Sequence, residues 1–390
     1  DTVEMKGEGF EAFVNSGAKV KAGDKKTLDK KAVDEKIVPT SLKDIAEKVG
    51  VNVSTVSRAL NDRGRISNEK KLEIKRIANE LGYIPNESAQ ILAGKNARTI
   101  GLLLPEISSN YYARIAAVVE NELQNKGYSI IIGQTNFIIE NELEYIKLFA
   151  GKNVDGIITS ALMSKEILFE ASRYVNLKQV PIVHMEPIIS ANCDINNYNF
   201  IGCDIINIDN DYGVWLAVKH LSDLGHKRIG FISEYISSTI RLPSFINAAL
   251  KCKLFTASTR SKYNFIKLGK ERFEIGGYLR MKELLEEKDI PTGVFASYDN
   301  MALGAMTAIL EKGLKIPEDI SIVGFDNIRE ALFFPTPLTT ISPPVEEIGK
   351  MAVQKLVEKI EKKSQINKGQ EIILKPKLVV RKSTAIFIKS

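Results

Sequence analysis

The sequence predicts an α/β protein in which an all-helical domain precedes a core of doubly wound parallel sheets. Two short amphipathic helices around the turn at residues 50–52 indicate the helical domain. From Ile100 onward, apolar strands alternate with amphipathic helices over about 240 residues, an order typical of parallel sheets with helices on both faces. That length suits two lobes better than one, and a chain of 390 residues can bury a substantial core.

The predicted pair of helices lies within residues 40–60. Apolar side chains recur at helical spacing on one face of each helix. Gly50 can adopt the left-handed conformation that ends the first helix, and Asn52 can cap the second. The outer face of the second helix carries Val53, Ser54, Thr55, Ser57 and Arg58. Small hydroxylic side chains and one long cation suit a helix that enters the DNA major groove, so we expect a helix-turn-helix; an ordinary helical hairpin is the alternative.

Two more helices are expected before the strands begin. Ser67 precedes a segment with an apolar stripe, which Gly82 ends. Residues 86–94 begin with a capping Asn86 and end with Gly94, but a helix of this length is unstable alone in water. DNA or a partner chain would therefore have to order it.

The core alternates strands and helices in two similar series. Its predicted strands are residues 99–105, 128–135, 154–160, 226–233, 292–299 and 320–326. Its predicted helices are residues 111–127, 142–153, 210–225, 276–287 and 301–313. Parallel sheets of this kind bind ligands beyond the carboxyl ends of their strands, so we expect a ligand site in the cleft between two lobes.

Basic charge is concentrated near the predicted helix-turn-helix. The whole chain has a formal net charge of +6, and residues 40–98 hold 11 basic and 7 acidic side chains. Residues 1–39 hold 8 of each. Contact with phosphates would require this placement, and an ordinary solvated basic surface is the alternative.

Several classes of protein are not indicated. Cys193, Cys203 and Cys252 form no CxxC pair and the three histidines lack metal-site spacing, so we expect neither a disulfide framework nor a metal. The sequence motifs of serine hydrolases and P-loop enzymes are absent, and we expect no catalytic residues and no cofactor. Without a long apolar run or a visible signal peptide, we expect no membrane span and a cytoplasmic location.

Ordered motifs extend from about Thr40 to Thr384. They include SLKDIAEKVGVNVSTVSRALN, LGYIPNESAQILAG, TIGLLLPEIS, VFASYDNMALGAMTAILEKGLKIPEDISIVGFDN and PLTTISPPVEEIGKMA. On these motifs the chain resembles the lac/gal repressor family of bacterial transcription regulators. The resemblance implies a DNA-binding headpiece, a hinge helix, and a two-lobed effector core similar to periplasmic sugar-binding proteins. It also implies a homodimeric repressor on a near-palindromic operator of double-stranded DNA, controlled by a small molecule, which we expect to be a sugar or sugar derivative.

The resemblance assigns roles to residues of the headpiece and the hinge. Base edges would be read by Val53, Ser54 and Arg58. Phosphate or positioning contacts would come from Thr40, Thr55, Ser57 and Asn61. The hinge helix would contribute Asn86 as its cap, Ala89 where two hinge helices meet, and Leu92 as a minor-groove wedge. Structural roles are the alternatives, with Val53 packing, Ser57 capping, and Leu92 an ordinary apolar helix position.

The resemblance also assigns effector-binding residues in the core. Arg241 and Asp299 lie where the family keeps an arginine and an aspartate at the ligand, and a charged pair suits a polyhydroxylated or anionic molecule. The aromatic positions of the family are occupied by Tyr111, Tyr112 and Phe273. An interlobe salt bridge and core packing are the alternatives.

The sequence departs from the family near these residues. Ser109-Asn110 replaces the usual Asn-Pro, Tyr298 stands where asparagine is common, and Ser244 replaces a common glycine. The identity of the effector therefore cannot be carried over.

The first residues do not resemble this family. Residues 1–25 resemble a truncated piece of the glucose-type enzyme IIA of the sugar phosphotransferase system, through DTV, GEGF and spaced glycines. No histidine precedes His184, so the phosphoacceptor is missing. We expect a poorly ordered remnant over 1–38, a headpiece over 39–84, a hinge over 85–97 and a core over 98–390. A solute-binding protein with the same core is the alternative function, but it leaves residues 40–94 unexplained.

Overall fold

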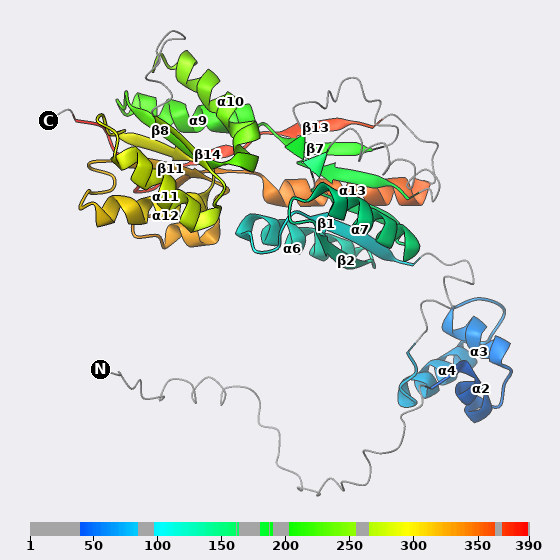
Figure 1. Cartoon of the computed structure of the whole chain (residues 1–390). Coiled ribbons are helices and arrows are strands. Elements are labelled where there is room, and N and C mark those ends of the chain that lie inside the picture. Colours follow the sequence, from blue (N-terminus) through cyan, green and yellow to red (C-terminus); the bar gives the residue numbers. More distant parts are fainter. Residues whose placement is uncertain are drawn as a thin grey trace, which may run out of the picture. The chain divides into compact units, whose positions relative to one another are not determined.

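The computed structural model describes most of the chain in several ranges (Figure 1). They are residues 40–84, 97–160, 162–163, 180–186, 188–189, 203–254, 265–362 and 369–388. The chain forms two compact units, divided between Asn86 and Glu87. The expected remnant over 1–38 and nearly all of the expected hinge over 85–97 lie outside the described residues.

The first unit consists of three helices. They are α2 (Leu42–Val49), α3 (Val53–Leu60) and α4 (Asn68–Glu80). Ser41 and Asp44 form a reciprocal capping box at the start of α2, and Gly50 ends that helix with a φ of 72°. Asn52 precedes α3 as expected, but its side chain makes no capping hydrogen bond, so that part of the prediction is wrong. The buried faces meet in one small core of Ile45, Ala46, Val49, Val56, Ala59, Ile74, Ile77 and Ala78.

Lobe 1 of the second unit is a parallel sheet in the order β13-β7-β5-β3-β1-β2. The strands are β1 (Thr99–Leu104), β2 (Ser129–Gln134), β3 (Gly156–Thr159), β5 (Ile182–Met185), β7 (Asp204–Ile208) and β13 (Glu371–Leu374). The helices are α6 (Asn110–Asn125), α7 (Ile139–Gly151) and α13 (Val345–Lys362). Helices α6 and α13 share one core with the sheet, whereas α7 belongs to a separate core. Two short strands, β4 (Leu162–Met163) and β6 (Ile188–Ile189), pair with each other.

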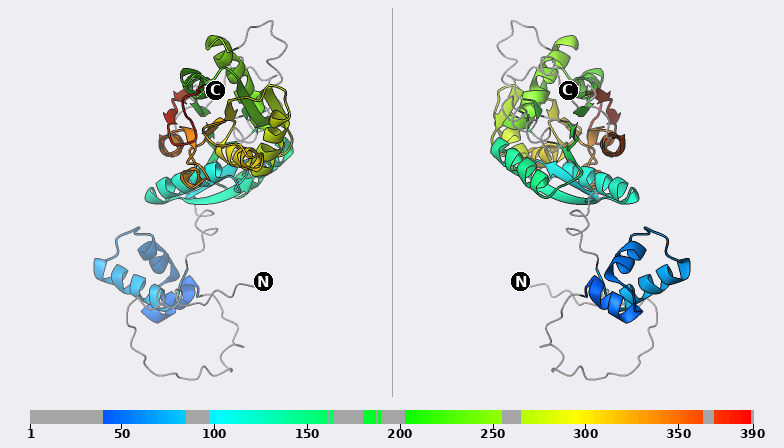
Figure 2. Two further views of the ribbon diagram at one scale, coloured as in Figure 1. Left: turned by 90° about the vertical axis from the view of Figure 1, so that its left-hand side faces the viewer. Right: turned by 90° about the vertical axis from the view of Figure 1, so that its right-hand side faces the viewer.

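Lobe 2 is a sheet in the order β14-β12-β11-β10-β8-β9, parallel except for β14. The strands are β8 (Ile229–Glu234), β9 (Ile266–Gly269), β10 (Gly293–Ala296), β11 (Ser321–Phe325), β12 (Thr339–Ser342) and β14 (Lys377–Val379). The helices are α9 (Asn210–Asp223), α10 (Tyr235–Lys251), α11 (Phe273–Leu285), α12 (Asp299–Glu311) and the 3-10 helix η4 (Arg329–Leu332). Helices α9 and α10 cover one face and α11 and α12 the other, each pair with its own core (Figures 1 and 2).

The chain passes between the lobes three times. It crosses from β7 to α9, from β12 to α13, and from β13 to β14. Each lobe is therefore built from segments that are far apart in the sequence, and α13 lies against lobe 1 although it follows lobe 2 in the chain. The expected α/β class, with a helical headpiece and two doubly wound lobes, is confirmed.

Two glycines allow α11 and α12 to pack closely together. A Cβ atom on Gly277 would lie 1.8 Å from the Met301 carbonyl oxygen, and one on Gly304 would lie 1.8 Å from the Glu274 carbonyl oxygen. The backbones of the two helices thus touch where any side chain would collide. In the described part of the chain, no helix is long and apolar enough to cross a membrane.

Candidate functional site

Helix α3 exposes the side chains that were expected to read bases. Ser54 and Arg58 are exposed, and 41% of Val53 is accessible to solvent. On the opposite face, Val56 and Ala59 are completely buried in the three-helix core. The core therefore fixes the helix and leaves this face for a partner.

The four residues expected to contact phosphates are more enclosed. Thr55, Ser57 and Asn61 are half-buried, and the Asn61 amide donates to the Ser57 carbonyl at 2.7 Å. The Thr40 hydroxyl donates to the Leu81 carbonyl at 2.6 Å and so joins the start of the headpiece to the end of α4. Such side chains can still accept a phosphate contact while they hold the headpiece together, and their role at DNA remains a prediction.

Positive charge on the headpiece is divided into paired and unpaired groups. On α4, Lys75 lies 2.9 Å from Asp62 and Arg76 lies 2.5 Å from Glu80. Among the described residues, Arg58 makes no ion pair, and neither do Arg63 and Arg65 in the loop that follows α3. These cations are available to phosphates and base edges. The hinge residues Asn86, Ala89 and Leu92 lie outside the described residues.

The second candidate site is a pocket between lobe 1 and lobe 2. It is partly open to solvent, and its volume is about 780 Å³ when that open space is included. Its lining comes mainly from the carboxyl ends of parallel strands and the helices that follow them, which is where this architecture binds ligands. The lining residues are Glu106, Ser109, Tyr111, Tyr112, Phe137, Glu186, Asn207, Asn210, Ser237, Ile240, Arg241, Arg272, Phe273, Tyr298, Asn300 and Asp326.

Arg241 is held firmly at the lobe 2 side of the pocket. Its guanidinium carbon lies 3.8 Å from the centre of the Phe325 ring, and Nη1 donates to the Ser297 carbonyl. Nη2 is 3.8 Å from the Asp326 carboxylate, and both side chains are 14% exposed. The stacked ring and the two oxygens fix the cation so that it faces the pocket.

Asp299 does not form the expected charged pair with Arg241. It is completely buried at the start of α12 and is not among the residues that line the pocket. Its carboxylate accepts from the Thr340 hydroxyl at 2.5 Å and from the Ile328 amide at 2.9 Å. These two hydrogen bonds hold the Asp299 carboxylate inside lobe 2. The carboxylate beside Arg241 is that of Asp326, where Asp299 had been expected.

Aromatic side chains from both lobes surround the pocket. Tyr111 and Tyr112 meet edge to face, with ring centres 5.4 Å apart. Phe273 packs edge-on against Tyr298 at 6.1 Å, and its amide donates to the Tyr298 hydroxyl at 2.9 Å. All three aromatic residues expected from the sequence, Tyr111, Tyr112 and Phe273, therefore line one pocket.

The carboxylates of the pocket are hard to ionise. Burial raises the pKa of Glu186 to about 7, although the Tyr111 hydroxyl donates to it. Burial also raises the pKa of Asp326 to about 7, against the opposing effect of Arg241. A ligand that donates hydrogen bonds to these oxygens would stabilise their charged forms.

Several pocket residues have a positive φ, a backbone conformation that is unfavourable for residues with a side chain. Phe137, Glu186, Phe273 and Asp326 have φ values of 59°, 45°, 54° and 102°. Left-handed backbone is uncommon for residues other than glycine, and it concentrates at functional sites. This clustering supports the assignment of the pocket as a binding site.

Sequence reasoning missed the main charged groups of this pocket other than Arg241. Glu106 follows β1, Glu186 follows β5, Arg272 follows β9 by three residues, and Asp326 follows β11. Their shared position at strand ends was the available signal, because that edge had already been predicted to bind ligand. The described residues contain no group of three or more His, Cys, Asp or Glu side chains placed to hold a metal.

Glu186→Gln is expected to stabilise the ligand-free protein at high pH and not at low pH. The folded-state pKa of Glu186 is raised from 4.5 to about 7, so stability falls as pH rises from about 4.5 to 7 and stays lower above that. The amide removes this loss while still accepting from Tyr111, so we expect a gain on the order of 1–3 kcal/mol at pH 8 and little change at pH 5. Urea unfolding at both pH values measures it, with the exposed Glu330→Gln as control. An equal change at both pH values would contradict the assignment.

Comparison with known proteins finds matches for both the headpiece and the core among bacterial transcription regulators and related binding proteins. Residues 41–86 match the profile of bacterial regulatory proteins of the lacI family, and residues 218–384 match a periplasmic binding protein-like domain. The chain is 32% identical over 348 residues to the HTH-type transcriptional repressor PurR of Edwardsiella ictaluri, covering 88% of this chain and 97% of that protein.

Two solved structures extend the similarity to the fold. A lac repressor dimer bound to operator and the anti-inducer ONPF has a TM-score of 0.77 and 26% identity, covering 89% of this chain and all of that one. A complex of the transcriptional regulator CelR with cellobiose has a TM-score of 0.62 and 26% identity, covering 88% and 99%. Both units of the chain thus have counterparts in single proteins.

Proposed function

This chain belongs to the lacI family of bacterial regulatory proteins and is an effector-controlled DNA-binding regulator, and we propose that it represses transcription as a homodimer under the control of a carbohydrate. The headpiece would bind a near-palindromic operator through α3, with Val53, Ser54 and Arg58 at base edges. Thr40, Thr55, Ser57 and Asn61 would position it, and Asn86, Ala89 and Leu92 would act in the hinge. We take the domains as 1–38, 39–84, 85–97 and 98–390.

The lining of the pocket carries the effector half of the proposal. Asparagine and serine side chains supply hydrogen-bond donors and acceptors, Arg241 adds a cation, Glu186 adds a carboxyl group, and aromatic rings offer flat apolar faces. A sugar presents hydroxyl groups around its edge and C–H groups on its faces, so this combination suits a carbohydrate. The similarity to a cellobiose-bound regulator supports the same class.

Coupling between the pocket and the headpiece would act through the arrangement of the two lobes, which three chain crossings join. A ligand that contacts both lobes binds one lobe arrangement more tightly than others, and it can change operator affinity only through that difference. The chain would act in the cytoplasm, where bacterial DNA lies, and we propose neither a catalytic role nor a cofactor. A solute-binding protein with the same core is disfavoured, because it would have no use for the exposed face of α3.

Two measurements test the proposal. Selection of duplexes from a random pool should enrich a near-palindromic sequence, and the enriched duplex should be retarded by a dimer. A thermal-shift screen of mono- and disaccharides should then find a sugar that raises the melting temperature and changes operator affinity. Failure to enrich any sequence would overturn the DNA-binding half, and a sugar that binds without changing operator affinity would overturn the coupling.

Arg58→Ala is expected to relax sequence preference. An arginine that pairs with a base edge contributes roughly 1–3 kcal/mol of discrimination, so operator variants at one position should become nearly equal in affinity. Titration of the enriched duplex and its single-base variants measures the effect. Arg76→Ala is the control, because Arg76 is paired with Glu80 on α4. If all variants weakened equally, Arg58 would be a phosphate contact.

A further inference from the structure

An ion pair joins the two lobes across the cleft. Arg272 belongs to lobe 2, where it precedes α11, and its Nη2 lies 2.8 Å from Oε1 of Glu106. Glu106 belongs to lobe 1, where it follows β1. The Arg272 and Glu106 side chains are 22% and 11% exposed, so the pair is largely shielded from water. Both residues line the pocket.

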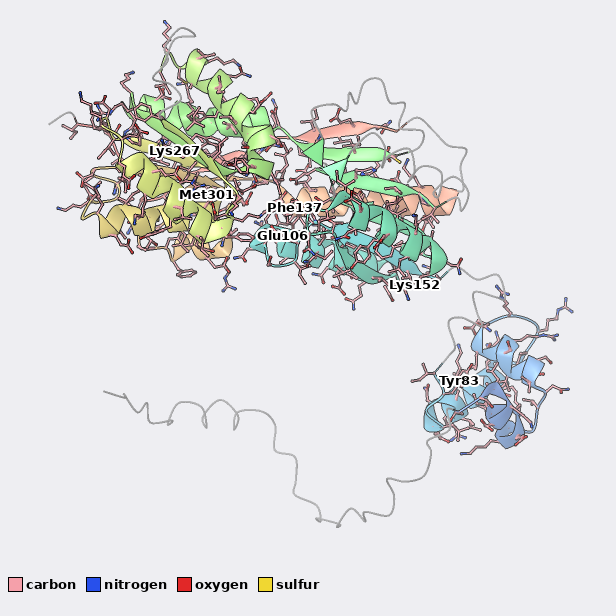
Figure 3. All side chains as sticks on the ribbon, viewed as in Figure 1. Tyr83, Glu106, Phe137, Lys152, Lys267 and Met301 are labelled. Atoms are coloured by element: carbon pink, nitrogen blue, oxygen red, sulfur yellow. The ribbon has the colours of Figure 1, made fainter. Side chains whose placement is uncertain are left out.

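Aromatic rings from both lobes enclose the same cation. The guanidinium carbon of Arg272 lies 4.3 Å from the centre of the Phe137 ring, which belongs to lobe 1 and follows β2. It lies 5.2 Å from the centre of the Phe273 ring, which belongs to lobe 2. Figure 3 shows Glu106 and Phe137 close together on the part of lobe 1 nearest lobe 2. A cation from one lobe is thus bound by a carboxylate and a ring of the other.

We propose that Arg272, Glu106 and Phe137 form an interlobe latch that sets how readily the effector pocket opens and closes. The proposal concerns regulation of the pocket and rests on the function proposed above. Each of the three side chains is a positioning group, because it acts through the separation of the lobes. Opening would break the ion pair and the contact with Phe137 together, while the contact with Phe273 lies within lobe 2.

In the latch, the attraction between Arg272 and Glu106 is opposed by the cost of removing both charges from water. Burial raises the pKa of Glu106, and the charge of Arg272 opposes this effect. Nε and Nη1 of Arg272 are buried without a hydrogen-bond partner in the part of the chain that the structure describes. A shielded pair with unused donors is only modestly stable, so its closed form can be opened at low cost. An effector oxygen that accepted from one of these donors would favour the closed form, which links occupancy of the pocket to closure.

The chain offers a matched control within one lobe. Lys267 lies 2.6 Å from Glu287, with side chains 20% and 26% exposed, and both residues belong to lobe 2. Lys267 lies on the edge strand β9, in the part of lobe 2 away from lobe 1 (Figure 3). This ion pair is similar in length and exposure to the pair between Arg272 and Glu106, and its removal leaves the contacts between the lobes unchanged. Lys267→Gln therefore separates the loss of a charge pair from the loss of the latch.

Distances between spin labels test the latch without any effector. Labels are attached to cysteines at the exposed positions 152 in lobe 1 and 288 in lobe 2 of the full chain, with the three native cysteines replaced by serine. Labelled chains are diluted with unlabelled ones so that the distances arise within one chain. We expect Arg272→Gln and Glu106→Gln each to raise the ratio of open to closed forms at least about fivefold, and the double variant no further. Lys267→Gln should leave the distances unchanged.

Exchange of the two charges makes the test specific. Glu106→Arg combined with Arg272→Glu should restore part of the closed population lost in the single variants, since the ion pair is re-formed in reverse while the contact of the Arg272 cation with Phe137 is not. Circular dichroism melting confirms that each variant is folded. If Arg272→Gln does not fold, it is replaced by Arg272→Lys, which keeps the charge but lacks the planar group that stacks on Phe137. Parental distances in the single variants would overturn the latch. Because no sugar is added, that outcome is distinct from failure of the thermal-shift screen, which would overturn the proposed function.

Discussion

Arg241→Ala is expected to abolish effector binding while leaving the operator affinity of the ligand-free protein nearly unchanged. The substitution removes a cation that faces the pocket and leaves the Ser297 carbonyl and Asp326 without their partner. Loss of one member of a shielded, hydrogen-bonded charge pair costs roughly 2–5 kcal/mol of ligand binding, or a factor of at least about 30 in the dissociation constant. The headpiece is a separate unit and keeps its own core, so DNA recognition should persist.

Two titrations measure this result. Isothermal titration uses the sugar found in the thermal-shift screen, and retardation of the enriched duplex is measured without sugar. Arg329→Ala is the control, because Arg329 is an exposed cation of lobe 2 outside the pocket lining. Parental sugar affinity in Arg241→Ala would rule out this pocket as the effector site, and a large loss of operator affinity would show that Arg241 acts on the headpiece.

Gly304→Val is expected to prevent lobe 2 from folding. The new side chain would collide with backbone atoms of α11, since even its Cβ would lie 1.8 Å from the Glu274 carbonyl oxygen and 2.8 Å from the Tyr278 amide nitrogen. Backbone atoms cannot move aside as a flexible side chain can, so α11 and α12 would have to separate. We expect a loss of about 4 kcal/mol or more, which few single domains tolerate.

Urea unfolding and soluble yield measure the effect of this change. Gly151→Ala is the control, because a Cβ on Gly151 at the end of α7 meets no atom within 4 Å. This control should change stability by less than about 1 kcal/mol, and alanine favours the helix. Parental stability in Gly304→Val would show that the two helices are not packed as closely as the structure has them.

The sequence was sufficient to predict the local elements of the fold. Apolar runs and helical periodicity depend on neighbouring residues, and they predicted β1, β2, β3 and the helices of the headpiece correctly. Membership in a lobe could not be predicted in the same way. Helix α13 packs on α6 and the lobe 1 sheet, and β13 pairs with β7, although both follow most of lobe 2 in the chain. Such pairings depend on contacts between distant segments, which periodicity does not record.

In the pocket, too, the sequence predicts what depends on neighbouring residues and not what depends on contacts between distant segments. Arg241 and Phe273 line the pocket where the family motif places them. Asp299 matches the family motif as well as Arg241 and Phe273 do. Its carboxylate is nevertheless bound inside lobe 2 by Thr340 and Ile328, which come from distant segments. The strand-end rule predicted the edge of each sheet at which the pocket lies. It could not say that Glu186 and Asp326 would be the acidic groups there, because the rule concerns backbone direction.

The order in which the lobes are completed affects how the chain emerges from the ribosome. The headpiece is fully synthesised by residue 84, but the core of lobe 1 needs apolar side chains of α13, about 140 residues after β7 has been made. At about 5–20 residues per second, the earlier strands of lobe 1 remain without that helix for roughly ten seconds or more. Lobe 2 in turn needs β14, close to the end of the chain. Nascent chains of this protein therefore expose apolar sheet surface for much of their synthesis, and chaperones that bind such surface are expected to be needed until translation ends.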